Sequence, residues 1–475
     1  MRPGARARSV EDVPLHRVTQ ERTDRSADLY ALPGSGRALP RYTLPEGPMP
    51  AREAYQLIRD ELALDGNSRQ NLATFCTTWS EPEVRALMTD TLDKNMVDKD
   101  EYPQTAELEA RCVHILAALW HAPHGAAAVG CSTTGSSEAA MLGGLALHRR
   151  WRARRRAAGL PADRPNLVCG PVQVCWEKFA RYFDIELRRM PLLPGRTTSD
   201  PAQLARYCDE NTIGVVATLG VTFTGAYEPV EEIATALDAL AARTGTDVPI
   251  HVDAASGGFV APFLQPGLKW DFRIERVKSV NCSGHKFGLA PLGVGWVVWR
   301  DAGDLPDELV FHVDYLGGDM PTFALNFSRP GGEIVAQYYN LLRLGRTGYQ
   351  AVQRACADTA VALADGIAGL GPFQVLHDGR AGLPVVCWTL TPERAADRAG
   401  WTLYDLAERL RLRGWQVPTY PLPADREETV VQRVVVRHGV SRDLTTLLLA
   451  DVRGALAELA RHPAATAEQR PAFHH

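Results

Sequence analysis

Residues 213–255 read IGVVATLGVTFTGAYEPVEEIATALDALAARTGTDVPIHVDAA. The first run, 213–220, is apolar and rich in β-branched residues, which is typical of a buried strand. Residues 228–245 have the apolar spacing of a helix that ends at a glycine, and 247–255 form a second strand that contains Asp253. Two buried strands joined by a helix of this length predict a mostly parallel sheet that is covered on both faces.

The same alternation continues on the N-terminal side of this stretch. Residues 166–170 and 185–192 have strand patterns, and 175–183 and 200–210 have helical patterns, the latter with Asp200 as a cap. Ligands bind beyond the carboxyl ends of the strands in such sheets. Asp253 therefore lies where a reactive carboxylate is expected.

The chain changes character after about residue 345. Helical patterns at 359–370 and 402–414 mix with short strands at 384–390 and 429–439, which predicts a smaller C-terminal α+β domain. We therefore expect four parts: an N-terminal segment, 1–65, partly disordered and engaged in oligomer contacts; a large domain, 66–345; a small domain, 346–462; and a flexible tail, 463–475.

Composition excludes several classes of protein. The 475 residues carry a net charge of −4, so the chain lacks the cationic field of a general nucleic-acid binder. The basic run at 149–156 is interpreted as the solvated end of a helix. The nine cysteines are scattered singly, which favours a reducing compartment, and we expect a cytoplasmic protein. Neither a signal-peptide core nor an apolar run long enough to span a membrane is present.

Three motifs carry candidate chemistry. The first, GCSTTGSSEAAMLGG at 130–144, places Ser136 and Ser137 where a helix begins, and a helix N-terminus with hydroxyl groups can bind a phosphate. On this stretch alone an ordinary N-cap, with Glu138 in the first turn, is slightly favoured. The segment lacks the lysine of a P-loop and the spacing of a dinucleotide fingerprint.

The other two motifs contain Asp253 and Lys286. A carboxylate that ends a buried strand is usually a structural hydrogen-bond acceptor, and a lysine can extend its amine to the surface. Lys286, however, lies in the apolar, glycine-rich run SGHKFGLAPLGVGW, where a desolvated amine can form a Schiff base. A phosphate cradle, a strand-end acid and an imine-forming lysine together match the phosphate, ring nitrogen and aldehyde of pyridoxal 5′-phosphate. No metal site is predicted.

The chain resembles the glutamate decarboxylases of the bacterial and plant type, which are group II pyridoxal-phosphate-dependent decarboxylases. The similarity covers about residues 40 to 460 and includes NLATFCTTW (71–79), HVDAASGGFVAPF (251–263), SGHKFGLAPLGVGWVVWRD (283–301) and TLYDLAERLRLRGWQVP (402–418). The resemblance implies the pyridoxal-phosphate-dependent transferase fold of type I, which is aspartate-aminotransferase-like. It also implies conversion of L-glutamate to 4-aminobutanoate and CO2 through an external aldimine and a quinonoid.

The resemblance assigns roles at the cofactor. Lys286 corresponds to the imine-forming lysine, Asp253 to the partner of the pyridinium, and His285 to a catalytic and phosphate-binding residue. Ala255 would pack against the ring, Gln173 would cover it, and Thr222 would lie near its phenolic oxygen. The phosphate ligands would be Ser136, Ser137, Ser283 and His285, with Ser328 reaching in from a neighbouring subunit.

The resemblance also assigns a substrate site. Thr74 and Phe75, with Asn95 and Asp98 from the partner chain, would bind the distal carboxylate of glutamate. Without the resemblance, Asn95 and Asp98 would be interpreted as a helix C-cap and a loop. A carboxylate site that contains Asp98 becomes favourable where the two acids share a proton, which favours activity in acid. Since the reaction consumes a proton, acid resistance or 4-aminobutanoate supply are the expected physiological roles.

Shared sites imply at least a dimer, and hexamers occur in the family. The final residues FHH resemble a C-terminal histidine that closes the site near neutral pH, with His475 or His474 as the regulatory residue. We expect no calmodulin-binding extension. The alternatives are another decarboxylase or an aminotransferase of the same fold, and a non-catalytic scaffold. The match at Thr74, Phe75 and Asn95 argues against the first, and the intact Lys286 and Asp253 argue against the second.

Overall fold

The strands expected in the middle of the chain form a large sheet in the computed structural model, which describes residues 42–123, 128–313, 320–396, 400–423 and 425–462. Among these residues the sheet has seven strands in the order β1-β7-β6-β5-β4-β2-β3. The pairs among β6, β5, β4, β2 and β3 are parallel, and β7 is antiparallel to both β6 and β1. The strands are β1 (Val129–Thr133), β2 (Asn166–Cys169), β3 (Glu186–Arg189), β4 (Thr212–Thr218), β5 (Ile250–Asp253), β6 (Val277–Ser283) and β7 (Gly295–Trp299). The prediction of a mostly parallel sheet is confirmed.

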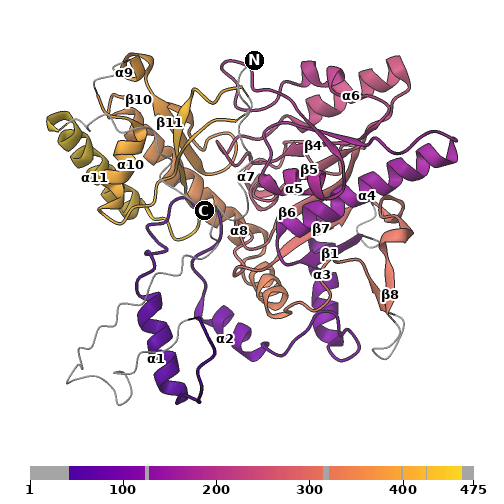
Figure 1. Cartoon of the computed structure of the whole chain (residues 1–475), viewed down its shortest axis with the longest axis horizontal. Coiled ribbons are helices and arrows are strands. Elements are labelled where there is room, and N and C mark those ends of the chain that lie inside the picture. The colour runs from indigo at the N-terminus through magenta and orange to yellow at the C-terminus, as the bar shows by residue number, and fades with distance from the viewer. Residues whose placement is uncertain (1–41, 124–127, 314–319, 397–399, 424, 463–475) are drawn as a thin grey trace. The chain divides into compact units, whose positions relative to one another are not determined.

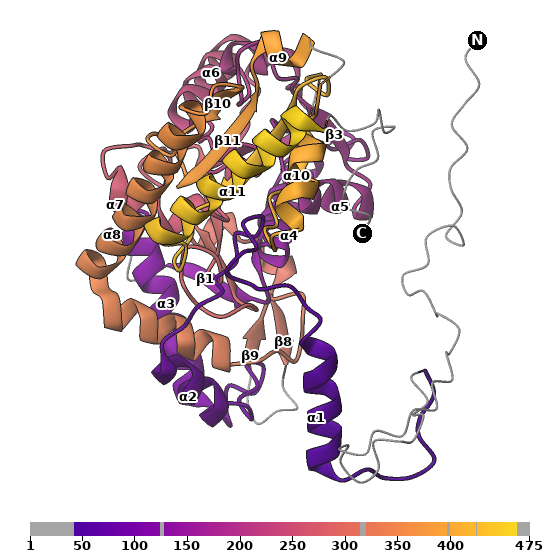
Figure 2. The ribbon, with the colours of Figure 1, turned by 90° about the vertical axis from the view of Figure 1, so that its left-hand side faces the viewer.

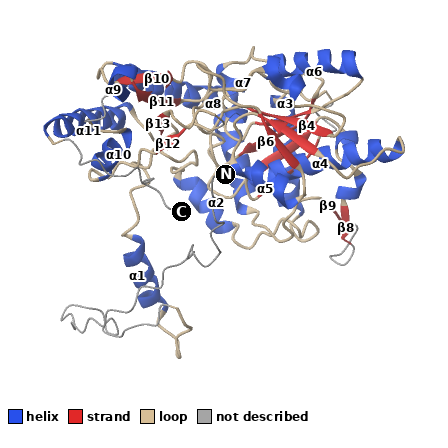
Figure 3. Ribbon diagram, turned by 45° about the horizontal axis from the view of Figure 1, so that its top comes forward, coloured by secondary structure: helices blue, strands red, loops and turns tan. Residues whose placement is uncertain are grey.

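Helices lie around this sheet, and Figure 3 shows its red strands among them. They are α2 (Pro82–Asp90), α3 (Pro103–Leu119), α4 (Ser136–Ala157), α5 (Val174–Tyr182), α6 (Val230–Thr244) and the short α7 (Ala261–Leu264). Apolar side chains of α3, α6 and β4–β7 form one large buried cluster, and those of α4, α5 and β2 form another. The expected helix at 200–210 is instead the 3-10 helix Pro201–Arg206, and Asp200 caps it as predicted by accepting from the Ala202 N–H.

A second, smaller sheet follows the long helix α8 (Gly332–Ala368). Its order is β10-β11-β13-β12, all antiparallel, with β10 (Phe373–His377), β11 (Val385–Leu390), β12 (Thr419–Pro421) and β13 (Val430–Val435). The helices α9 (Pro392–Ala396), α10 (Leu403–Arg411) and α11 (Arg442–Arg461) accompany it (Figure 2). Buried side chains of α8, α10, α11 and this sheet form one cluster, so the expected C-terminal α+β region is present.

The helix α8 contacts helices that precede it in the chain as well as the smaller sheet that follows it (Figure 1). Its N-terminal half packs on α2 and α3, and its C-terminal half on β10, β11 and α11. The helical conformation breaks at Gly345, whose φ of 55° favours glycine, at the boundary expected between the large and small domains. The chain divides into two compact units, Met1–Gly66 and Asn67–His475, so a division near 345 stays a prediction.

The unit Met1–Gly66 contains α1 (Ala51–Leu62), and a two-stranded ribbon pairs β8 (Phe311–Val313) with β9 (Met320–Thr322). The basic run at 149–156 lies at the end of α4 as expected, where Arg150 pairs with Asp304 and Arg152 with Glu308. No described helix has both the length and the apolar character needed to cross a membrane.

Candidate active site

The carboxyl ends of β4 and β5 border a cavity of about 300 Å³. The start of α4 and the loop after β6 complete its wall. Eight of the predicted site residues line it: Ser136, Ser137, Gln173, Thr222, Asp253, Ala255, His285 and Lys286. The structure therefore brings together, from five separate segments, the candidate phosphate cradle, the strand-end acid and the half-buried Lys286.

Asp253 ends β5 and is 4% exposed. Its Oδ2 accepts a hydrogen bond from Trp176 Nε1 at 2.8 Å, and its Oδ1 accepts from the Ala255 N–H at 3.1 Å and from Asn281 Nδ2 at 3.2 Å. An indole N–H, a backbone N–H and an amide NH2 can only donate. These three donors fix the orientation of the Asp253 carboxyl group in the wall of the cavity.

Lys286 lies in the loop after β6, with Nζ 3.4 Å from Ser256 Oγ and 5.5 Å from the centre of the Phe75 ring. Burial lowers the pKa of Lys286 from its ordinary value, and the nearby Asp253 carboxylate only partly opposes this shift. An amine with a lowered pKa is more often neutral, and the neutral amine is the nucleophile. Lys286 therefore has the chemical state that carbonyl capture requires.

The backbone of this loop is held from behind by α8. The carbonyls of Phe287, Gly288 and Leu289 accept hydrogen bonds from four α8 side chains: Gln353 at 2.9 Å to Phe287, Gln337 at 3.0 Å and Tyr349 at 2.8 Å to Gly288, and Asn340 at 2.9 Å to Leu289. On the other side, the Thr77 hydroxyl donates to the Lys286 carbonyl at 2.6 Å. Because buried carbonyls are costly to leave unpaired, these contacts fix the path of the loop.

The start of α4 forms the cradle at the other side of the cavity. Its N-cap is Gly135, which has no side chain to cap the helix, so the first-turn N–H groups have no side-chain acceptor there. Glu138 does not cap either, since its Oε2 accepts from the Thr134 N–H at 2.8 Å and the Thr134 hydroxyl at 3.0 Å. Gly295 allows the close approach, because a Cβ there would lie 2.6 Å from the Ser136 nitrogen. The alternative of an ordinary N-cap is thus not what the structure shows.

One buried hydroxyl and one imidazole fit an anionic, polar ligand at this end. Ser283 Oγ is buried and lacks a hydrogen-bond partner among the described residues, which is unusual for a buried polar atom. Burial, together with the Lys286 charge, lowers the pKa of His285 from 6.5 to about 4, so the ring is neutral. His285 Nδ1 accepts from the Gly293 N–H at 3.3 Å, which leaves the ring proton on Nε2. A phosphate would satisfy these groups.

Three further predicted residues border the cavity. Gln173 caps α5, with its side-chain oxygen accepting from the Cys175 N–H at 2.7 Å, so the amide is held in one orientation. Ala255 follows Asp253 directly. The Thr222 carbonyl accepts from Arg433. Their roles toward a cofactor stay predictions, but all three line the same cavity as Asp253.

Thr74 and Phe75, the predicted substrate residues, precede α2 in a loop that reaches Lys286. Phe75 is 8% exposed, and the Arg433 guanidinium lies 4.6 Å from the centre of its ring. Arg433, from β13, donates to the Ala73 carbonyl at 2.6 Å as well as to Thr222. This arginine therefore joins the two loops that carry predicted substrate and cofactor residues.

Asn95, Asp98 and Ser328 form a separate cluster. Asn95 Nδ2 donates to Asp98 Oδ2 at 3.0 Å and to Ser328 Oγ at 3.3 Å, and none of the three lines the cavity. A buried ion pair, Arg329–Glu109 at 3.2 Å, lies beside this cluster. All three residues expected from a neighbouring subunit are thus gathered at one place outside the chain's own cavity.

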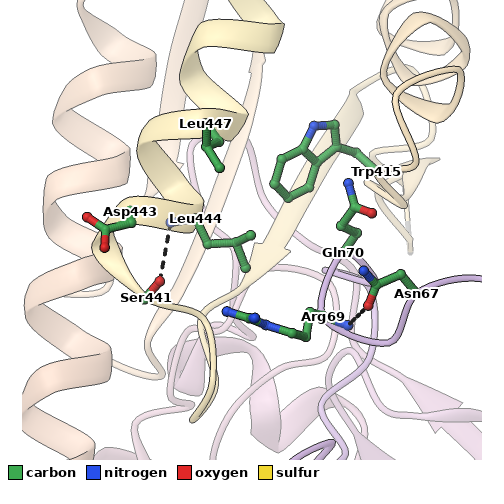
Figure 4. Close-up of a pocket in the computed structure, with 8 residues that line it drawn as sticks. All are labelled: Asn67, Arg69, Gln70, Trp415, Ser441, Asp443, Leu444 and Leu447. Atoms are coloured by element: carbon green, nitrogen blue, oxygen red, sulfur yellow. Dashed lines mark hydrogen bonds between the residues drawn. The ribbon is translucent and has the colours of Figure 1, made fainter.

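Another cavity, of about 370 Å³, lies where α11 begins (Figure 4). Its wall contains Trp415, Leu444 and Leu447 with Arg69 and Asp443, and none of the predicted site residues. The regulatory candidates His474 and His475 lie outside the described residues.

Several residues at the site were not foreseen from the sequence. They are Trp176 and Asn281 at Asp253, Ser256 at Lys286, and Arg433 with the α8 side chains. One signal was available: His251 and Asp253 alternate on β5, and Ser279, Asn281 and Ser283 alternate on β6. Polar residues at every second position of a buried strand share one face and must pair there.

Comparison with known proteins gives consistent results. Residues 45–391 match the pyridoxal-dependent decarboxylase conserved domain. The chain is 57% identical to a glutamate decarboxylase of Aliivibrio fischeri, over 95% of this chain and 97% of the relative, and 51% identical to glutamate decarboxylase 5 of Arabidopsis thaliana, over 89% and 85%. A solved glutamate decarboxylase of Lactobacillus brevis is similar with a TM-score of 0.86 and 46% identity, over 90% of this chain and 97% of that one.

Proposed function

Since the chain belongs to the pyridoxal-dependent decarboxylases, we propose that it binds pyridoxal 5′-phosphate in the cavity of Lys286 and Asp253 and decarboxylates L-glutamate to 4-aminobutanoate. The observation that carries this proposal is a buried amine of lowered pKa in one cavity with a carboxylate held by three donors. Similarity to glutamate decarboxylases over nearly the whole chain supports glutamate as the substrate.

The residues present fit the cofactor at each of its polar ends. Ser136, Ser137, Ser283 and His285 Nε2–H would hold the phosphate, and Asp253 would keep the ring nitrogen protonated. When bound, the cofactor supplies an aldehyde and a cationic ring that accepts the electrons of a breaking bond at the substrate Cα. Ala255 and Gln173 would contact the two faces of the ring, with Thr222 near its phenolic oxygen.

The protein's contribution is capture, orientation and proton control. Lys286 supplies a neutral amine for capture, and its loop is fixed by α8, so the amine returns to one position after each turnover. Thr74 and Phe75 would place glutamate so that its α-carboxylate bond stands perpendicular to the ring. That orientation favours loss of CO2 over other reactions of the same amino acid, because one transition state is stabilised selectively.

The enzyme is further proposed to act as a homo-oligomer with shared sites. The cluster of Asn95, Asp98 and Ser328 lies outside the chain's own cavity, as expected of groups that serve a neighbouring subunit. Co-expression of a Lys286→Arg chain with an Asn95→Leu chain tests this. Each homodimer is expected to be inactive, while mixed dimers keep one intact site, so activity should return to about one quarter of the parent's. No recovery in confirmed mixed dimers would show that the sites are not shared.

We also propose a cytoplasmic location and a role in acid tolerance. All nine cysteines are free thiols in the structure, which suits a reducing compartment. Decarboxylation followed by protonation at Cα consumes one proton, so continued turnover would remove acid from the surrounding solution.

The decisive experiment combines a spectrum, a label and a product. The purified protein should show the visible band of bound cofactor, and borohydride should fix the cofactor to the peptide that contains Lys286. Glutamate should yield 4-aminobutanoate, and aspartate should yield no product. Label on another lysine, or equal turnover of aspartate, would contradict the assignment.

A further inference from the structure

A chain of hydrogen bonds runs behind Asp253, away from the cavity. Asn281 Nδ2 donates to Asp253 Oδ1 at 3.2 Å, His251 Nε2 lies 2.7 Å from Asn281 Oδ1, and His251 Nδ1 lies 2.7 Å from Ser279 Oγ. His251 and Asn281 are 0% exposed and Ser279 is 1% exposed. The three residues join neighbouring strands, β5 and β6.

Asp253, at the end of this series of hydrogen bonds, fixes which group donates and which accepts in each of them. An ionised Asp253 accepts, so Asn281 must present its NH2 group to Asp253 and its oxygen to His251. His251 must then carry its proton on Nε2. Its Nδ1 accepts from the Ser279 hydroxyl, because burial lowers the pKa of His251 and keeps the ring neutral.

His251 is held tightly in this position. Its ring packs edge-on against Trp176, with ring centres 5.1 Å apart, and Trp176 is itself a donor to Asp253. On the other side α4 passes so closely that a Cβ at Gly143 would lie 2.5 Å from His251 Nδ1. The helix that begins at the phosphate cradle therefore also confines the imidazole.

We propose that His251 is a positioning residue that acts through Asn281 to hold the Asp253 carboxylate in the orientation in which it accepts from the ring nitrogen of the cofactor. This inference rests on the proposed function, because it assumes that pyridoxal phosphate occupies the cavity. The other titratable groups close enough to influence Asp253 or His251 are Lys286, Cys175 and Cys282. The two thiols are buried, and their pKa values are raised, so they stay neutral.

Two variants of His251 separate hydrogen bonding from packing. Glutamine can place an NH2 donor near the position of Nε2, whereas leucine fills similar space without a donor. Both full-length proteins are freed of cofactor and titrated with pyridoxal phosphate, and the visible absorption of the bound cofactor is recorded. Losing the neutral hydrogen bond from His251 to Asn281, which orients the partner of Asp253, weakens cofactor binding by roughly fivefold. We therefore expect His251→Leu to raise the dissociation constant by about that factor and to change the visible band.

The glutamine variant should recover most of the affinity and the parent's band. Thermal unfolding of the cofactor-free proteins shows whether both variants are folded. Parent-like binding by His251→Leu, or equal weakening in His251→Gln, would overturn the inference. If His251→Leu does not fold, Ser279→Ala decides, because it removes only the hydroxyl that fixes the tautomer: weaker cofactor binding supports the proposal, and unchanged binding refutes it. A parent protein that binds no pyridoxal phosphate would instead refute the proposed function.

Discussion

Replacing Gly143 by alanine adds a single methyl group at the point where α4 passes His251. A Cβ there would lie 2.5 Å from Nδ1 and 3.3 Å from Nε2 of His251, whereas ordinary contacts begin near 3.4 Å. Nearly an ångström of movement is therefore required. His251 cannot move freely, because Ser279 and Asn281 bind both of its nitrogens at 2.7 Å.

Two opposing effects set the size of the change in stability. Alanine in a helix interior is favoured over glycine by about 1 kcal/mol. Overpacking of a tight core costs about 1–3 kcal/mol, and a displaced imidazole loses a hydrogen bond worth about 1 kcal/mol more. The net result is a destabilisation of about 1–3 kcal/mol. With an unfolding entropy of about 1 kcal/mol per kelvin for a chain of 475 residues, the unfolding midpoint should fall by roughly 1–3 °C.

Gly454 provides the matched control. It lies in α11, and a Cβ at this position would meet no atom within 4 Å. Gly454→Ala should therefore raise the midpoint by roughly 1 °C, because only the helix preference changes. Both variants are scanned with the parent at one scan rate and one saturating cofactor concentration. If Gly143→Ala is as stable as Gly454→Ala, the imidazole is not confined by α4 and this reasoning is wrong.

Three further predictions follow from other contacts. Thr77→Val removes the hydroxyl that donates to the Lys286 carbonyl at 2.6 Å. We expect the free energy of unfolding, measured by denaturant unfolding, to fall by about 1 kcal/mol. We also expect a lower kcat, measured by CO2 release. Burial lowers the pKa of His148 from 6.5 to about 4, so between these pH values the unfolded chain binds one proton more than the folded chain. The free energy of unfolding therefore falls as the pH drops from 6.5 towards 4. His148→Gln should shrink the fall in unfolding midpoint between about pH 7 and pH 5. Arg433→Met removes the hydrogen bonds to the Ala73 and Thr222 carbonyls, so it should raise KM for glutamate by a larger factor than it raises the dissociation constant of the cofactor. A larger effect on cofactor binding than on KM would contradict the proposal that Arg433 joins the two loops.

Three strands of the sheet were predictable because they are buried along their whole length and are mostly apolar. The strand patterns at 166–170, 213–220 and 247–255 correspond to β2, β4 and β5, and the helical pattern at 228–245 to α6, which ends at Gly245 with φ 75°. The pattern at 200–210 failed because a helical period cannot reveal that only a 3-10 helix forms from Pro201. Strand order was not predictable, since β1 pairs with β7, a strand far from it in the sequence, with Thr133 opposite Gly295.

Some residues of the candidate site were likewise predictable from the sequence, and others were not. Ser136, Asp253 and Lys286 were found because each has a local signature: small residues before a helix, an acid after a strand, and a lysine among apolar residues and glycines. The α8 side chains that hold the Lys286 loop have no local signature. Gln337 and Gln353 lie more than 50 residues after Lys286 in the sequence, and they resemble ordinary polar residues of a helix. Only the tertiary structure shows that these amides are buried and directed at carbonyls of the lysine loop.

The distance between the acid and the lysine is set by the register of β5 against β6. Asp253 is paired with Asn281, and Lys286 follows Asn281 by five residues in the same continuous segment. Side chains alternate along a strand, so a slip of one residue would turn Asn281 to the other face and remove its hydrogen bond from Asp253. The same slip would take His251 away from both Ser279 and Asn281 and would shift the lysine loop against α8. The buried polar pairs thus specify the one register in which the anion and the amine face the same cavity, which explains why polar residues are kept inside strands that would be more stable with apolar ones.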